Sequence, residues 1–210
     1  MASHTARRSY QSTRRGEQAA RTGADIVAAA TRLFTQEGWG KTTMAKVAVE
    51  AGVAVETVYQ RFKSKAALMR AAIDATIGGI GGAEPLRDQE RFARLGQGDT
   101  AERLAALALL ATDINARTHG LFEAWRQAAG ADPAIAAGLH EYETRRRSDV
   151  AAGLALIRGG PVDERTVDAV WAVLSTDVYS RLVSDRAWSP SNYAAFVQET
   201  VQALLAADGS

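Results

Sequence analysis

Apolar residues recur at helical spacing through most of this sequence, and this periodicity constrains the fold more than any other feature. An apolar stripe on one helix face requires a repeat of three or four residues. The first clear stripe consists of Ile26, Val27, Ala30, Leu33 and Phe34. No segment bounded by turn residues alternates apolar and polar residues, as an amphipathic strand does. We therefore predict an all-α fold of about nine helices.

The first 20 residues are polar, rich in arginine, serine and threonine, and without apolar periodicity. Such a segment buries too little apolar surface to offset the entropy of ordering, so we expect a flexible basic arm over residues 1–20. The first helix then begins near Thr22, whose hydroxyl is suited to cap it, and stops at Gly38.

Two short helices on either side of one glycine follow. Thr43 is placed to cap a helix over Met44–Ala51, and Gly52 ends it because glycine readily adopts the positive φ of a tight turn. A third helix is predicted over Val55–Phe62, and Ser64 is placed to cap a fourth. This arrangement is typical of a helix-turn-helix, whose second helix enters the major groove of DNA.

Closely spaced glycines interrupt the helical pattern after the fourth helix, and we expect a flexible joint at Gly78–Gly82. Helical periodicity resumes beyond it and closes with a helix that Ser189 caps and Pro190 begins. The expected organisation is an arm over residues 1–20, a helix-turn-helix domain over 21–66, and a larger helical bundle over 67–210.

Charge divides the chain in the same way. Residues 1–70 contain 12 basic and 5 acidic residues, whereas the remaining 140 contain 13 basic and 19 acidic residues. All four lysines lie in the basic part: Lys41, Lys46, Lys63 and Lys65. This distribution is expected of a segment that faces a polyanion, although a solvated basic face is the alternative.

Several classes of protein are excluded by composition. The chain has no cysteine, which excludes disulfides and thiolate chemistry. A membrane span needs about 20 apolar residues, whereas the longest uncharged run is the 12 residues 187–198, so we expect no membrane helix. The N-terminus contains arginines 7, 8, 14, 15 and 21 but no apolar core typical of a signal peptide, and we predict a cytoplasmic protein.

Two stretches, IVAAATRLFTQEGW and TTMAKVAVEAGVAVETVYQRFKSKAALM, resemble the DNA-binding domain of the tetracycline-repressor (TetR) family of transcriptional regulators. The resemblance covers roughly residues 22–73. Its spacing is more restrictive than that of a helix-turn-helix alone, because it also includes Tyr59, Phe62, Ser64 and Lys65. The C-terminal stretch WSPSNYAAFVQETVQALL resembles the last helix of many family members.

The resemblance implies double-stranded DNA as a partner and assigns the residues that contact it. Those implied to lie at phosphates are Thr43, Lys46, Tyr59, Lys63 and Lys65, and those implied to face bases or sugars are Val55, Glu56, Thr57 and Gln60. Thr42 is a further implied DNA-binding residue. The role of Arg61 stays open. The chemistry is consistent with base contacts, because glutamine pairs with adenine, valine contacts the thymine methyl and glutamate accepts from cytosine.

Two residues depart from the family pattern. Ala54 stands where serine or threonine usually caps the recognition helix, and this change should cost that helix about 1 kcal/mol. Glu56 stands where many members have glycine. Its carboxylate either reads a base or only complements the positive end of the helix dipole, and we favour the dipole.

An acidic helical part after a basic one suggests that something other than DNA binds there, and the resemblance to the family implies a small-molecule effector in a pocket between its helices. The candidate lining residues are His119, Phe122, Trp125, His140, Tyr142, Trp171 and Tyr179, each of which could instead be plain core. His119 and His140 have no partner at a known zinc-binding spacing, and no nucleophile–base pair or cofactor fingerprint is visible. We predict no metal, no cofactor and no enzymatic activity.

Two long apolar stripes mark the last helices. The first consists of Val167, Val170, Trp171, Leu174, Val178 and Leu182, and the second of Tyr193, Phe196, Val197, Val201, Leu204 and Leu205. In the family these helices meet their symmetry mates in a four-helix interface, which implies a homodimer. The alternative is that both stripes serve only the core of their own chain.

The combined hypothesis is a homodimeric repressor that binds a pseudo-palindromic operator and loses affinity for it when an effector binds. The alternative is a DNA-binding regulator without an effector, whose larger domain only dimerises.

Overall fold

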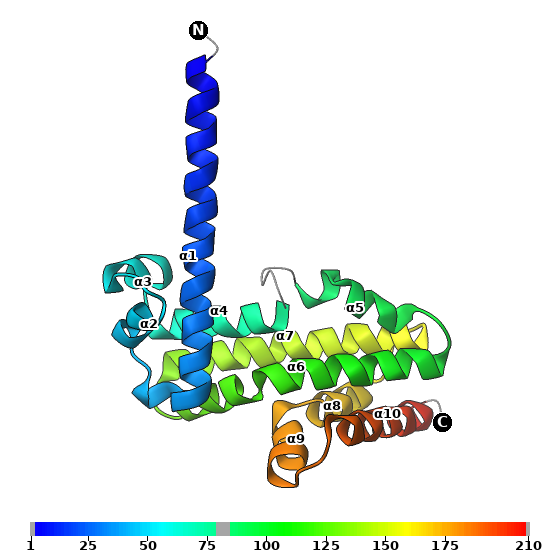
Figure 1. The fold of residues 1–210 in the computed structure, drawn as a ribbon. Helices are drawn as coiled ribbons and strands as arrows, with labels where there is room; N and C mark the ends of the chain where they lie inside the picture. The colour runs from blue at the N-terminus through cyan, green and yellow to red at the C-terminus, as the bar shows by residue number, and fades with distance from the viewer. Residues whose placement is uncertain (1–2, 79–84, 209–210) are drawn as a thin grey trace. The chain divides into compact units, whose positions relative to one another are not determined.

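The protein is described here by a computed structural model, which gives the backbone of residues 3–78 and 85–208 and the side chains of the same ranges from residue 16 onward. Throughout these ranges the regular structure is helical and contains no strand, as predicted (Figure 1). The chain forms two compact units, residues 1–72 and 73–210. The boundary lies within α4 (Lys65–Gly78), the helix that also contains the expected boundary at residue 66.

The first unit begins with α1 (Ser3–Lys41), which is longer than the sequence suggested. The expected flexible arm over residues 1–20 is helical from Ser3, and Thr22 does not begin the helix, since its hydroxyl donates to the carbonyl of Gln18 inside it at 3.0 Å. Gly38 interrupts the helix with φ 75°, as the expected stop at this position required. Only one further turn leads from Gly38 to Lys41.

The helix ends that follow are held by the predicted caps. Thr43 precedes α2 (Met44–Glu50), and its hydroxyl accepts from Lys46 N at 3.1 Å. Ala54 precedes α3 (Val55–Phe62) without a side-chain cap. Ser64 precedes α4, and its hydroxyl accepts from Ala67 N at 3.1 Å. These short helices therefore begin where their sequence indicates.

Apolar side chains from all four helices form the core of the first unit. Ile26 and Phe34 of α1, Val47 of α2, Val58 of α3 and Leu68 of α4 are all fully buried. Ile26 and Phe34 belong to the first apolar stripe seen in the sequence, and burial of each such side chain contributes about 1.5–3 kcal/mol. The core therefore fixes which faces of α2 and α3 remain outside.

Two long helices, α6 (Thr100–Ala129) and α7 (Pro133–Arg158), form the centre of the second unit. Figure 1 shows them side by side. Before them lie η1 (Leu86–Asp88), α5 (Glu90–Ala93) and η2 (Arg94–Gly96), and after them α8 (Glu164–Val173), α9 (Thr176–Tyr179) and the π-helical segment η3 (Ser180–Asp185). The chain ends with α10 (Pro190–Ala207), which packs on α6 and α8 and is capped by Ser189 as predicted.

A buried polar link joins three of these helices. The Asn115 amide on α6 donates to the carbonyl of Leu174 at 3.2 Å and to the hydroxyl of Tyr193 on α10 at 3.0 Å. At the other end of α10, Asp208 is paired with Arg158 and accepts from the Thr166 hydroxyl at 3.1 Å. Both ends of α10 are thus tied to the unit by polar contacts as well as by packing.

Two further expectations concern the whole chain. The predicted joint at Gly78–Gly82 lies outside the described residues except for Gly78, which ends α4. Within the described ranges, every helix is too short or too polar to span a membrane.

Candidate nucleic-acid interface

The helices α2 and α3 form the helix-turn-helix that the sequence predicted. The turn is closed by backbone hydrogen bonds from Ala51 N to Val47 O and from Val53 N to Ala48 O, both 2.9 Å. Gly52 has φ 66°, a conformation in which a residue with a Cβ is strained. The glycine therefore permits the tight turn that directs α3 away from α2.

One face of α3 is buried and the other is open and polar. Val58 packs into the core, whereas Glu56, Tyr59, Gln60 and Arg61 are exposed, Tyr59 with 51% of its surface. Val55 and Thr57 are half-buried beside this open face. A short amphipathic helix with its polar side chains outside is the element that a major groove accommodates.

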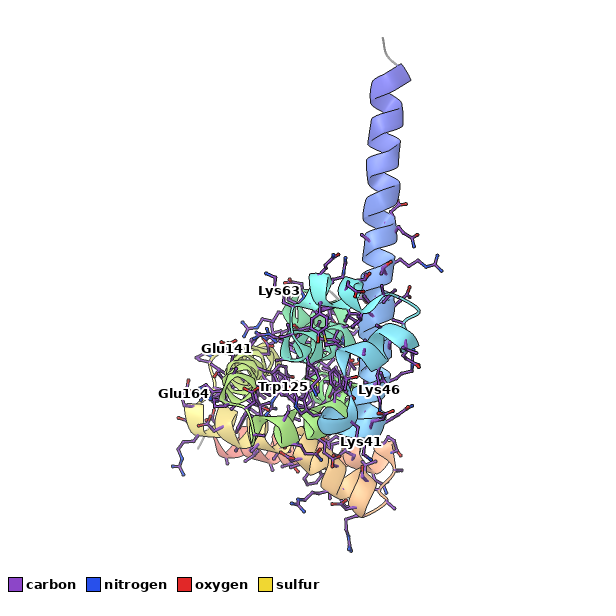
Figure 2. The ribbon with its side chains drawn as sticks, turned by 90° about the vertical axis from the view of Figure 1, so that its left-hand side faces the viewer. Lys41, Lys46, Lys63, Trp125, Glu141 and Glu164 are labelled. Carbon is purple, nitrogen blue, oxygen red and sulfur yellow. The ribbon has the colours of Figure 1, made fainter. Side chains whose placement is uncertain are left out.

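Two of the predicted phosphate contacts lie beside this face with their ammonium groups accessible, and both are labelled in Figure 2. Lys46 on α2 is half-exposed and paired with Glu37, with Nζ 2.6 Å from Oε2. Lys63 ends α3 with φ 55° and is exposed. The ammonium group of Lys46 is thus already paired, whereas no described carboxylate pairs with Lys63.

Thr42 and Thr43 have different positions although they are adjacent. Thr43 is exposed at the start of α2. Thr42 is completely buried, and its hydroxyl donates to the carbonyl of Gly38 at 2.9 Å. Its hydroxyl therefore binds a carbonyl at the C-terminal end of α1 and does not reach the surface, contrary to the expected DNA contact.

Lys65 also differs from the expectation, because its ammonium group is bound within its own unit. Nζ donates to the carbonyls of Trp39 and Thr42 at 2.8 and 2.9 Å, and it lies 4.1 Å from the centroid of the Trp39 ring. Burial lowers the pKa of Lys65 below its ordinary value. The residue holds the segment between α1 and α2, so at least two of its three donors are not available to DNA.

A groove between α1 and α3 adds residues that the sequence did not indicate. Gln18, Ala19 and Thr22 line one wall, and Thr57, Gln60 and Arg61 line the other, around a volume of about 410 Å³. The Arg61 guanidinium lies directly on Gly23, where a Cβ would overlap it. A glycine inside a helix is a signal for such a close approach, but the sequence does not show which residue approaches.

The expected effector residues fall into separate groups in the second unit. Phe122, Trp125 and Tyr142 are buried with ring centroids 4.8–5.8 Å apart, and Trp125 is labelled in Figure 2. Burial raises the pKa of Tyr142 well above its ordinary value. His119 and Tyr179 form a second group, with centroids 5.4 Å apart.

The remaining two candidates differ from each other. His140 is exposed on α7. Trp171 is half-buried beneath Arg146, whose guanidinium lies 4.8 Å from its ring, and its indole N–H is buried without a hydrogen-bond partner. Ring contacts thus join five of the seven predicted residues into two groups, while His140 is exposed and Trp171 packs beneath Arg146.

The predicted dimer stripes lie largely in the core of their own chain. Six of the ten residues expected at the interface are buried within one chain: Val167, Val170, Leu174, Tyr193, Val197 and Val201. The other four are half-buried: Trp171, Val178, Phe196 and Leu204. The six buried residues therefore fit the alternative in which the stripes serve the core of their own chain. They are not accessible to a partner.

Residues 26–72 match the family described as bacterial regulatory proteins, tetR family. No curated protein matches the sequence significantly.

Solved structures share the fold over most of the chain. A TetR transcription regulator from Haloarcula marismortui matches with a TM-score of 0.64, 15% identity, and coverage of 90% of this chain and 98% of the other. A member of the TetR family from Streptomyces coelicolor matches with a TM-score of 0.59 and 22% identity, over 88% of this chain and 98% of the other. The multidrug binding protein EbrR, solved with imidazole, matches with a TM-score of 0.57 and 22% identity, over 87% of this chain and 94% of the other.

The matched segment spans the core of α1, all of α2 and α3, and the part of α4 that belongs to the first unit. It therefore contains the helix-turn-helix described above, with its open polar face on α3. The N-terminal domain thus belongs to the tetR family of bacterial regulatory proteins, which are DNA-binding transcriptional regulators, and the chain as a whole has the fold of that family.

Proposed function

We propose that this protein is a cytoplasmic, homodimeric repressor that binds a pseudo-palindromic operator and releases it when a small molecule binds to the second unit. The observation that carries the proposal is the open polar face of α3, formed by Glu56, Tyr59, Gln60 and Arg61 beside the helix-turn-helix. Residues 21–66 act as the DNA-binding domain, and residues 67–210 bind the effector and dimerise.

In the proposed complex, the accessible groups divide into two roles. Thr43, Lys46, Tyr59 and Lys63 contact phosphates, and Val55, Glu56, Thr57 and Gln60 face bases or sugars. Lys65 and Thr42 are left out because both side chains are bound inside the unit. Phosphate contacts position the protein on the duplex, while base-edge contacts supply the sequence preference.

Dimerisation is proposed through the outer faces of α8 and α10. The exposed residues of α10 include Ala195, Glu199, Gln202 and Ala206, which form a stripe of small and polar side chains bordered on one side by the half-buried Phe196. A two-fold axis along such a face gives each chain the same contacts. It also allows two copies of α3 to meet half-sites about one turn of DNA apart.

An effector is favoured by one observation in the second unit. The buried Trp171 N–H has no acceptor, and an unmade hydrogen bond of this kind costs about 1–3 kcal/mol. A ligand with an acceptor atom and an apolar body would satisfy it. EbrR, which has the same fold, is a multidrug binding protein solved with imidazole. The competing proposal, a regulator without effector, requires that no compound changes operator affinity.

Coupling is proposed to run through α4, whose C-terminal turn is held by arginines of the second unit. Arg117 donates to the carbonyl of Thr76 at 2.9 Å, and Arg91 donates to the carbonyl of Ile77. Asp113 pairs with both arginines. An effector that prefers a different position of this turn weakens operator binding by the same coupling free energy that operator binding imposes on the effector.

The test is footprinting of purified protein on DNA upstream of its own gene. A protected dyad with half-sites about one helical turn apart is expected. The absence of any protected dyad at low salt would refute specific operator binding. Release of that DNA by an aromatic compound would distinguish the effector-responsive repressor from the regulator without an effector. The compound should release DNA less effectively from Trp171→Phe, because this substitution removes the N–H donor and keeps an aromatic ring.

A further inference from the structure

The N-terminal half of α1 places its arginines in a regular pattern. The five positions 7, 8, 14, 15 and 21 repeat at intervals of seven residues, and α1 is helical from Ser3. At 100° per residue, these positions fall within an arc of about 140° around the helix axis. Glu17, the one acidic residue before Asp25, lies outside this arc. The helical backbone therefore turns a basic segment into a one-sided basic stripe.

This stripe continues into the groove between α1 and α3. Gln18 lies on the α1 wall of the groove, four residues after position 14 and three after position 15. Thr22, on the same wall, lies seven residues after position 15. Residues at these intervals share one face of a helix. The arginine positions thus share the register of the α1 residues Gln18 and Thr22, which line the groove.

The groove itself carries the same charge and is open to a ligand. Arg61 and Arg21 are exposed, and no carboxylate of the described residues pairs with either. Arg61 is seated on Gly23, which allows its guanidinium to lie between the two helices. Gln60 and Thr57 of the recognition helix form the facing wall. The groove therefore joins the basic stripe to the proposed base-reading residues without a break.

We propose that the N-terminal segment of α1, from position 7 to the groove, is a second DNA-contacting helix that binds the phosphate backbone of the same duplex that α3 reads. This proposal rests on the proposed operator binding. The charge is complementary to phosphate, and the stripe from position 7 to position 21 is about 21 Å long at 1.5 Å per residue, comparable to about six base pairs of duplex. Its contacts are independent of base sequence.

A salt titration of full-length protein on a duplex tests the proposal. Each phosphate contact adds about 0.9 to the slope of log affinity against log salt, so Arg14→Gln/Arg15→Gln should lower the slope by about 1.8. The ratio of wild-type to variant affinity should then change about 12-fold between 50 and 200 mM salt. The matched control is Arg181→Gln/Arg186→Gln, which removes the same charge from two exposed positions of the second unit and should leave the slope unchanged.

A second variant distinguishes a helical face from a merely basic tail. Exchanging the pairs at 12–13 and 14–15, as S12R/T13R/R14S/R15T, keeps composition and net charge but moves both arginines off the stripe. The slope should fall as it does in the neutralised variant. A slope equal to that of the wild type would overturn the proposal, because a flexible tail does not depend on register.

The measurements use two duplexes, the upstream region that footprinting examines and an unrelated sequence of equal length. The arm variants should lose affinity on both, since phosphates are common to both. If the wild type binds neither duplex at 50 mM salt, the proposed DNA binding fails. If the wild type binds and the two arm variants match it in slope, only the inference about α1 fails.

Discussion

Replacing Lys65 with methionine distinguishes the structural role of this residue from the phosphate contact that its position in the motif implies. Methionine keeps an unbranched apolar stem but removes the ammonium group, which donates to the carbonyls of Trp39 and Thr42 and stacks on the Trp39 ring. Hydrogen bonds from charged donors contribute about 1.5–3 kcal/mol each, and an exposed cation–π contact about 0.5–1 kcal/mol.

Because the ammonium group is only partly buried, water replaces a share of these contacts in the variant. We therefore expect Lys65→Met to lower the free energy of unfolding by about 2–3 kcal/mol, less than the sum of the three contacts. Urea unfolding followed by circular dichroism measures this loss. The slope of DNA affinity against salt should stay close to that of the wild type, because Lys65 does not reach a phosphate.

Lys63→Met is the matched control. Lys63 is exposed, and methionine has the same backbone preference at φ 55° as lysine. Its stability should change by less than about 0.5 kcal/mol, while the salt slope should fall by about 0.9. The opposite pattern, an unchanged stability and a lower salt slope for Lys65→Met, would show that the ammonium group leaves its carbonyls to bind DNA.

Three further changes test other parts of the structure. Gly23→Ala should raise the melting temperature slightly, because alanine favours a helix by about 1 kcal/mol and the clashing Arg61 side chain is flexible. It should also weaken DNA binding, because it displaces the Arg61 guanidinium from the groove, and Arg61→Ala should have the same effect. Burial raises the pKa of Tyr193 to about 12, so the folded state keeps a proton that the unfolded state loses above about pH 10. Stability should fall between pH 10 and 12 in the wild type and less steeply in Tyr193→Phe, as measured by urea unfolding at each pH. Asp113→Asn should speed hydrogen exchange in the last turn of α4, since it weakens both arginine contacts there, whereas Asp177→Asn on α9 should not.

Local signals in the sequence were sufficient to locate the helix-turn-helix. Thr43 and Ser64 cap helices through hydrogen bonds within three residues, and Gly52 acts through its own backbone angle. Interactions of such short range can be inferred from the local sequence alone. The same reasoning correctly predicted the missing cap at Ala54.

Contacts between distant residues account for the differences. Lys65 lies 26 residues from Trp39, and nothing in its neighbourhood shows that its charge is already satisfied. The helical N-terminus of α1 also gave no apolar signal, because apolar periodicity reports only helices that pack on a core. Pattern and composition therefore do not show that the Lys65 ammonium group is bound internally, or that the backbone of the polar N-terminal segment is helical.

The dimer stripes show the limit of periodicity most clearly, and they also indicate where an interface has to be sought. The spacing of apolar residues by three and four identifies the buried face of α10. It does not show whether the same chain or a partner chain buries that face. Tyr193, Val197 and Val201 are covered by their own chain, and Asn115 binds the hydroxyl of Tyr193. A partner can therefore meet only the exposed face, on which Ala195, Gln202 and Ala206 lie on the side of the helix that Phe196 borders. If that face forms the interface, Ala195→Glu should produce a monomer that remains folded, whereas a charge placed at Val197 should unfold the chain, because its cost falls on the core.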